Sequence, residues 1–135
     1  MSSLLATRIA GALMILLGAA RGIGGALLLA HGHGADASIS ASPLGVAAVA
    51  AGLLLVGVLE ILCGVGVIRQ PSAWWRLAMI ATTLFVAGGL VNGTILYGHP
   101  GAGGTSMNAA VAIVIMSLLL WTRRGPRESR VDSMR

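Results

Sequence analysis

Charge and reactive side chains are scarce in this sequence. Charged residues make up 10% of the 135 positions, whereas a soluble domain averages about 25%. The single cysteine, Cys63, excludes a disulfide-stabilised scaffold. The chain is also 56% hydrophobic with a mean hydropathy of +0.90, which excludes a disordered protein. These properties together predict an integral membrane protein.

The few charges that are present are mostly basic. Lysine is absent, and nine arginines against four acidic residues give a net charge of +5. In a soluble protein this balance would suggest nucleic-acid binding, but here the arginines lie at the edges of apolar blocks and form no basic face on a soluble platform. We therefore expect no nucleic-acid partner.

Four apolar blocks account for most of the chain, and they cover residues 9–30, 44–68, 74–97 and 106–121. About 20 helical residues cross the ~30 Å hydrocarbon layer, so the blocks are long enough to span a membrane or nearly so. The connections between them are short and rich in glycine, histidine and proline. We predict an all-α membrane fold, an antiparallel four-helix transmembrane bundle over residues 1–122.

The arginines also predict the orientation of the bundle. The first and third connections contain no arginine, whereas the termini and the second connection carry Arg8, Arg69, Arg76, Arg123, Arg124, Arg127, Arg130 and Arg135. The positive-inside rule then places both termini in the cytoplasm, as in a bacterial-type inner membrane. Residues 123–135 are expected to form a disordered, basic cytoplasmic tail. As an alternative, small residues before Ser38 would suit signal peptidase, in which case the first block would be a cleaved signal.

Glycines recur along the first two spans at spacings that place them on one side of each helix. Small residues let membrane helices approach each other closely, so these positions are expected to mediate helix packing. The residues concerned are Gly18, Gly22, Gly25, Gly57 and Gly64.

Two charged residues, Arg21 and Glu60, lie within predicted spans. A charge at the centre of a bilayer costs on the order of 3 kcal/mol or more when unpaired, so we expect the two side chains to pair. The pair would either lock two helices together or form a pocket for a proton, an anionic group or a quinone-like head group. Asn92, an amide within the third span, also needs a polar partner and is added to this site. Cys63 is interpreted as a small packing residue.

A second polar group is expected at the outer face. His31, His33, Asp36 and His99 carry imidazole and carboxylate groups, which are ligands of transition metals. Histidines on a glycine-rich loop are more often solvated, so they are weak candidates for a metal site. No cofactor is predicted.

The first two spans resemble those of the DoxX-like family of small four-span bacterial membrane proteins. The resemblance is carried by the segment from Arg8 to Gly18 and by the Gly-x-x-Glu-x-x-x-Gly pattern formed by Gly57, Glu60 and Gly64. It implies an inner-membrane accessory protein, in some members linked to quinol oxidation or thiol redox complexes.

The sequence thus favours a small membrane subunit or accessory factor whose partners are the lipid bilayer and another membrane protein or a second copy of the chain. The alternative is a small proton-coupled transporter or channel that uses Glu60. An enzyme is disfavoured because no nucleophile, base and orienting group occur at a recognisable spacing.

Overall fold

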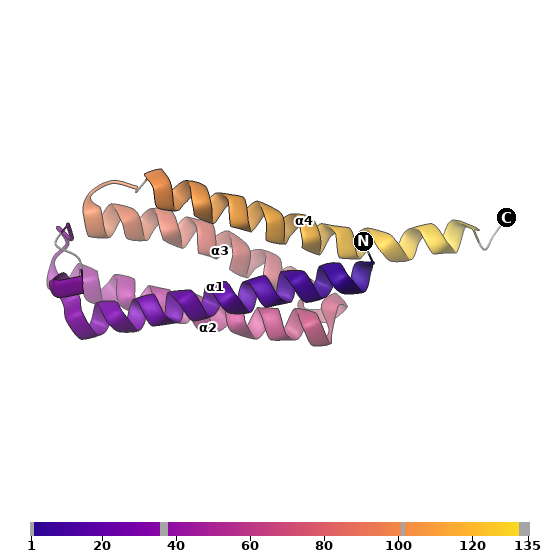
Figure 1. Cartoon of the computed structure of the whole chain (residues 1–135), viewed down its shortest axis with the longest axis horizontal. Coiled ribbons are helices and arrows are strands. Elements are labelled where there is room, and N and C mark those ends of the chain that lie inside the picture. Colours follow the sequence, from indigo (N-terminus) through magenta and orange to yellow (C-terminus); the bar gives the residue numbers. More distant parts are fainter. Residues whose placement is uncertain (1, 36–37, 101, 133–135) are drawn as a thin grey trace.

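The computed structural model describes the backbone of residues 2–35, 38–100 and 102–132, and within these ranges the side chains except those of residues 33, 35, 102–105 and 124–132. The described backbone is helical apart from short connections (Figure 1). Its elements are α1 (Ser3–His31), the 3-10 helix η1 (Gly32–Ala35), α2 (Pro43–Arg69), α3 (Pro71–Tyr97) and α4 (Ala102–Asp132).

Local sequence accounts for the helix ends. The Ser2 hydroxyl caps α1 and the Ser42 hydroxyl caps α2, each accepting a hydrogen bond from the backbone N–H three residues later. Pro43 and Pro71 occupy the first turns of α2 and α3, where the missing N–H costs no hydrogen bond. Gly98 ends α3 in the left-handed conformation, with φ 74°, which glycine adopts without strain.

All four helices are long and apolar enough to cross a membrane. The first three extend past the predicted spans by a few residues, because the flanking serines and prolines begin helices. In α4 the apolar stretch is Ser106–Arg123, but the helix continues to Asp132. The backbone of residues 123–132 is therefore helical where the sequence predicted a disordered tail.

The helices are arranged as a bundle in which each contacts two neighbours (Figure 1). The closest pair is α1 with α2, and the ring is completed by contacts of α2 with α3, α3 with α4, and α4 with α1. The N-terminus and the α2–α3 connection lie at one end, and the other two connections lie at the opposite end. Helices α1 and α3 thus occupy one diagonal of the bundle.

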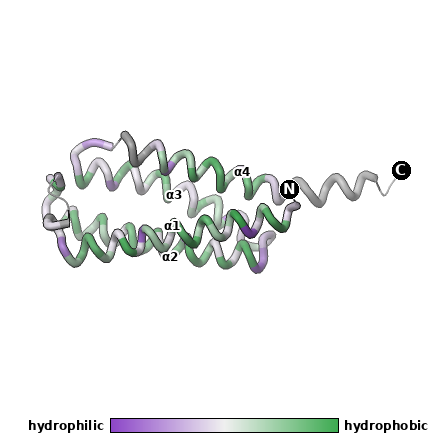
Figure 2. The backbone as a smooth tube through the Cα atoms, in the orientation of Figure 1, coloured by the Kyte–Doolittle hydropathy of each residue, from purple (hydrophilic) through white to green (hydrophobic). Residues whose placement is uncertain are grey.

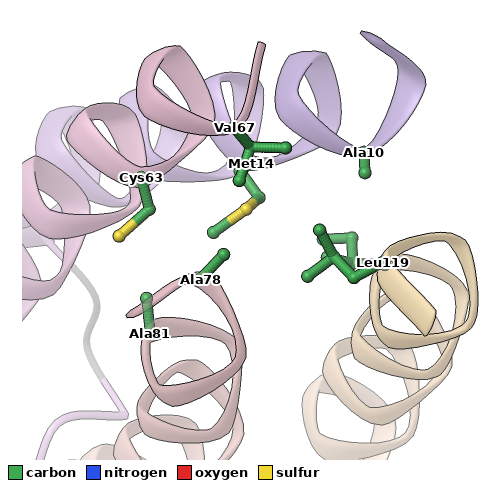
Figure 3. Close-up of a cluster of buried hydrophobic side chains, with 8 residues drawn as sticks. Ala10, Met14, Cys63, Val67, Ala78, Ala81 and Leu119 are labelled. Carbon is green, nitrogen blue, oxygen red and sulfur yellow. The ribbon is translucent and has the colours of Figure 1, made fainter. Parts of the chain in front are cut away.

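The main hydrophobic core lies nearer the N-terminal end and draws on all four helices (Figure 3). Met14 of α1 is fully buried between Cys63 and Val67 of α2 and Ala78 of α3. Leu119 of α4 closes the cluster. The small side chains in this core, Ala10 of α1 and Ala78 and Ala81 of α3, leave space between the helices. The long, flexible side chain of Met14 fills that space.

A smaller core closes the opposite end of the bundle. Leu28, Val46 and Leu96 are buried there together with Ile39 of the first connection. The backbone N–H of Ser40 donates to the Leu96 carbonyl at 2.9 Å. The connection between α1 and α2 is therefore packed onto the end of α3.

Apolar residues recur along all four helices (Figure 2). Large hydrophobic side chains point outward on every helix, as shown by Leu16, Leu55, Ile80 and Ile113, which are each more than half exposed. Such a surface would be unfavourable in water and is suited to contact with lipid. The chain accordingly has the architecture of a small integral membrane protein with four candidate membrane-spanning helices.

Candidate functional site

The candidate site is centred on Arg21, which lies in the middle of α1 and is half-buried. Its guanidinium reaches across the bundle to α3. Nη2 donates a hydrogen bond of 2.7 Å to the Phe85 carbonyl, and the guanidinium carbon lies 3.9 Å from the centroid of the Phe85 ring. The cation is therefore held by a backbone acceptor and by the negative face of an aromatic ring.

Two adjacent glycines of α3 make room for this guanidinium. A Cβ atom on Gly88 would lie 3.5 Å from Nη1 of Arg21, and a Cβ atom on Gly89 would lie 3.5 Å from Nη2. The Gly89 position also faces the Asn108 amide of α4, whose Nδ2 would be only 2.6 Å from that Cβ. The glycine pair is thus a notch in α3 that receives the Arg21 side chain from α1, across the bundle, and the Asn108 side chain from the neighbouring α4.

Glu60 of α2 is the acidic member of the site and is 1% exposed. It lies within Coulombic range of Arg21. Within the described part of the chain, however, no hydrogen bond or ion pair joins the two side chains, and both Oε2 of Glu60 and Nη1 of Arg21 are buried without a hydrogen-bond partner. The two charges that the sequence places within spans share the bundle interior, but Arg21 is bound to Phe85 instead of to the carboxylate.

These two unpartnered atoms are the most unusual feature of the interior. A buried polar atom without a hydrogen bond costs about 1–3 kcal/mol, and more when it carries charge. The site offers an unpartnered donor nitrogen at Arg21, which carries two N–H groups, and an unpartnered acceptor oxygen at Glu60. A small group that both accepts and donates hydrogen bonds would satisfy both atoms.

Asn92 of α3 lies apart from Arg21 and Glu60 in its hydrogen bonding within the described part of the chain. It is half-buried on α3 and has no hydrogen bond to Arg21 or Glu60 among the described interactions. The amide beside the guanidinium is that of Asn108 instead. Both residues stand out in the sequence, because Asn108 is an amide within an apolar span and Phe85 is the only phenylalanine, three residues before Gly88.

The glycines of the first two spans lie along the contact between α1 and α2. A Cβ on Gly18 would lie 2.5 Å from the Gly57 carbonyl oxygen, and a Cβ on Gly57 would lie 2.7 Å from the Gly18 carbonyl oxygen. Gly64 meets Gly11 in the same reciprocal way, and Gly25 faces Ala50. This seam holds the backbones of α1 and α2 close together and so fixes the heights of Arg21 and Glu60.

Gly22 differs from the others. No atom lies within 4 Å of the position that its Cβ would take, so the close approach expected of this residue is not made through its side-chain face. Its backbone nitrogen still lies 3.0 Å from the Cβ position of Gly57. Gly22 therefore borders the seam without filling it.

Cys63 lies one turn after Glu60 on α2 and is fully buried in the main core. It is a free thiol in the same buried apolar cluster as Met14 and Ala78 (Figure 3). Its environment is that of a small packing residue.

The candidate metal ligands His31 and His99 do not assemble into a site within the described residues. The His31 ring is exposed, with Nδ1 3.1 Å from the Leu27 carbonyl oxygen of its own helix, and His99 is exposed in the last connection. The side chain of His33 and the whole of Asp36 lie outside the described residues. In the described part of the chain, no three metal-ligating side chains come together.

Comparison with known proteins gives no match: no family model, no curated protein and no solved structure is similar to this chain.

Proposed function

We propose that the protein is a membrane subunit or accessory factor of a bacterial-type inner membrane, and that Arg21 and Glu60 form its ligand-binding centre. The observation that carries the proposal is the pair of unpartnered buried atoms, Nη1 of Arg21 and Oε2 of Glu60, in the interior of an apolar bundle. The resemblance of the first two spans to the DoxX-like family supports an accessory role.

The ligand best suited to these atoms is a quinone-like or anionic head group. A quinone carbonyl accepts a hydrogen bond from a guanidinium, and the hydroxyl of the reduced form donates one to a carboxylate. The Phe85 ring, which is 2% exposed, provides an aromatic surface beside the Arg21 guanidinium.

A binding assay tests this centre directly. We expect a short-chain ubiquinol analogue, whose hydroxyl groups can both accept and donate hydrogen bonds, to raise the melting temperature of the full chain in detergent, and Arg21→Met or Glu60→Gln to abolish the shift. Thr82→Val is the matched control, because Thr82 is equally buried on α3 but donates only to the Ala78 carbonyl within its own helix. A shift that persists in both site variants would overturn the quinone-binding proposal.

The second candidate is a small proton-coupled transporter, and the observation that favours it is the buried carboxylate of Glu60. An intramembrane carboxylate is the usual carrier of a proton in such proteins. Reconstitution in vesicles under an imposed pH gradient distinguishes the two functions. Proton flux that Glu60→Gln removes would favour the transporter, whereas absence of flux together with stable co-purification of a second membrane protein favours the accessory subunit.

We also propose that the four helices form an antiparallel transmembrane bundle with both termini in the cytoplasm. The distribution of arginines supports the cytoplasmic location of the termini. The start of α1 and the α2–α3 connection lie at the opposite end of the bundle from the other two connections in Figure 1, which supports the antiparallel order. Impermeant thiol labelling of intact spheroplasts tests it in a Cys63→Ala background. Ser38→Cys should be labelled, and Ser72→Cys should be protected until the membrane is permeabilised. The reverse pattern would show that the termini lie on the opposite side of the membrane.

A further inference from the structure

A cavity of about 720 Å³ lies at the N-terminal end of the bundle, far along the helices from Arg21 and Glu60. Its walls are the beginnings of α1 and α3 and the end of the apolar stretch of α4, which meet at the same end in Figure 1. Thr7 and Trp75 line its more buried part, whereas Ser3, Ser72 and Arg76 are exposed at its edge. The cavity therefore opens where the spans reach the surface of the bilayer.

Two arginines, Arg76 and Arg123, line this cavity, and no carboxylate is among the described residues that line it. The Arg123 guanidinium carbon lies 4.4 Å from the centroid of the Trp75 ring. Trp75 is itself fixed, because its Nε1 donates a 3.1 Å hydrogen bond to the Leu119 carbonyl. Stacking uses the face of a guanidinium and leaves the N–H groups at its edge available for an oxyanion.

The start of α3 adds a further positive group. Pro71 has no N–H, and the N–H groups of Ala73 and Trp74 donate to the Gln70 carbonyl, which leaves Ser72 as the first-turn residue whose N–H has no acceptor within the helix. The N-terminus of α3 has no side-chain cap among the described interactions. The positive ends of the α1 and α3 dipoles therefore face the same cavity as the two arginines.

We propose that this cavity binds the phosphate of an anionic phospholipid head group. Paired arginines and a free helix N-terminus are matched to the charge and the oxygen geometry of a phosphate. The position supports a lipid as its source, because Leu4 lines the cavity and is 62% exposed on the adjoining apolar surface, where an acyl chain would continue. This inference is independent of the ligand proposed for Arg21 and Glu60.

Native mass spectrometry of the full chain in detergent, titrated with dioleoylphosphatidylglycerol or dioleoylphosphatidylcholine, tests the site. We expect phosphatidylglycerol to bind more tightly, and the Arg76→Gln/Arg123→Gln double variant to weaken its binding roughly tenfold or more, since two charge-assisted contacts are lost. The matched control is Arg8→Gln/Arg69→Gln, which removes the same charge from exposed positions outside the cavity and should change the affinity less than about threefold.

The other outcomes of this titration distinguish a specific lipid site from general electrostatic attraction between the lipid and the basic protein. An equal loss in the two double variants, or equal binding of the two lipids, would overturn the proposal. Inorganic phosphate that displaces phosphatidylglycerol at millimolar concentration would identify a site for free phosphate and also overturn the lipid assignment. Should the double variant not fold, Arg123→Lys decides, because it keeps the charge but loses the planar donors that stack on Trp75; unchanged binding in that variant contradicts the proposed geometry.

Discussion

Arg21 of α1 is joined to Phe85 of α3 both by a 2.7 Å hydrogen bond to the carbonyl and by a guanidinium that lies 3.9 Å from the ring centroid. Helices α1 and α3 are on one diagonal of the bundle, so this contact crosses the interior instead of following a shared seam. It places a cation over the bundle axis and leaves one of its nitrogens, Nη1, without an acceptor.

The ring of Phe85 should contribute measurably to the stability of this contact. Cation–π interactions are worth about 2 kcal/mol when they are desolvated, and Phe85→Leu removes the ring while retaining the carbonyl acceptor. A double-mutant cycle with Arg21→Met should therefore give a coupling energy of about 1–2 kcal/mol in the free energy of unfolding, measured in mixed detergent micelles. Strict additivity of the two substitutions would show that the ring contributes only hydrophobic packing.

The glycine seam gives a second prediction with an internal control. A Cβ at Gly18 would lie 2.5 Å from the Gly57 carbonyl oxygen, and a backbone atom cannot move aside cheaply. Gly18→Ala should therefore lower stability by about 1–3 kcal/mol and depress the melting temperature. The Cβ atom that Gly22→Ala adds would lie in open space, so this substitution should leave the stability unchanged or raise it by up to about 1 kcal/mol, because alanine favours the helix. Equal effects at the two positions would contradict the arrangement of α1 against α2.

The different environments of these two glycines show where sequence reasoning ends. At 3.6 residues per turn, Gly25 is rotated about 20° from Gly18 around the helix, whereas Gly22 is rotated about 40° in the other direction. Apolar runs of sufficient length predict the existence of four helices, and seven-residue spacing indicates a common face. The rotation that α1 finally adopts is set by its packing against α2, and that packing turns the Cβ position of Gly22 away from the contact.

The same limit applies to the charged site. The depth of Arg21 and Glu60 follows from counting residues along two helices, and both do lie in the interior. Opposite charges alone predict a direct pair, but the guanidinium is bound by a ring and a carbonyl on a third helix. Phe85 and Asn108 lie in the site because of how α3 and α4 are shifted along and rotated about their axes relative to the other helices. Composition and residue spacing do not specify these shifts and rotations.

Arg21 and Glu60 should nevertheless be energetically coupled. Removing either charge leaves the other uncompensated in a low-dielectric interior, so Arg21→Met or Glu60→Gln alone should destabilise the protein by roughly 3 kcal/mol. The double variant should lose much less than the sum of the two, as measured by equilibrium unfolding in detergent. Additive losses would show that each charge is balanced separately, and the shared centre would then be wrong.

The notch at Gly88 and Gly89 yields the last prediction, which concerns the contact between α3 and α4. A Cβ at Gly89 would lie 2.6 Å from Nδ2 of Asn108, so Gly89→Ala forces that amide to move. Because the amide is the end of a flexible side chain, the cost should be modest, about 1 kcal/mol.

Asn108→Ala supplies the control, since it removes the amide that the new methyl group would strike. In the Asn108→Ala background, Gly89→Ala should lose its cost and gain the helix propensity of alanine, about 1 kcal/mol. A larger residue behaves differently, because Gly89→Leu would also displace the Arg21 guanidinium, whose Nη2 lies 3.5 Å from the Cβ position, and should remain destabilising in both backgrounds. If Gly89→Ala costs the same with and without the Asn108 amide, α4 does not pack against the notch in the way described.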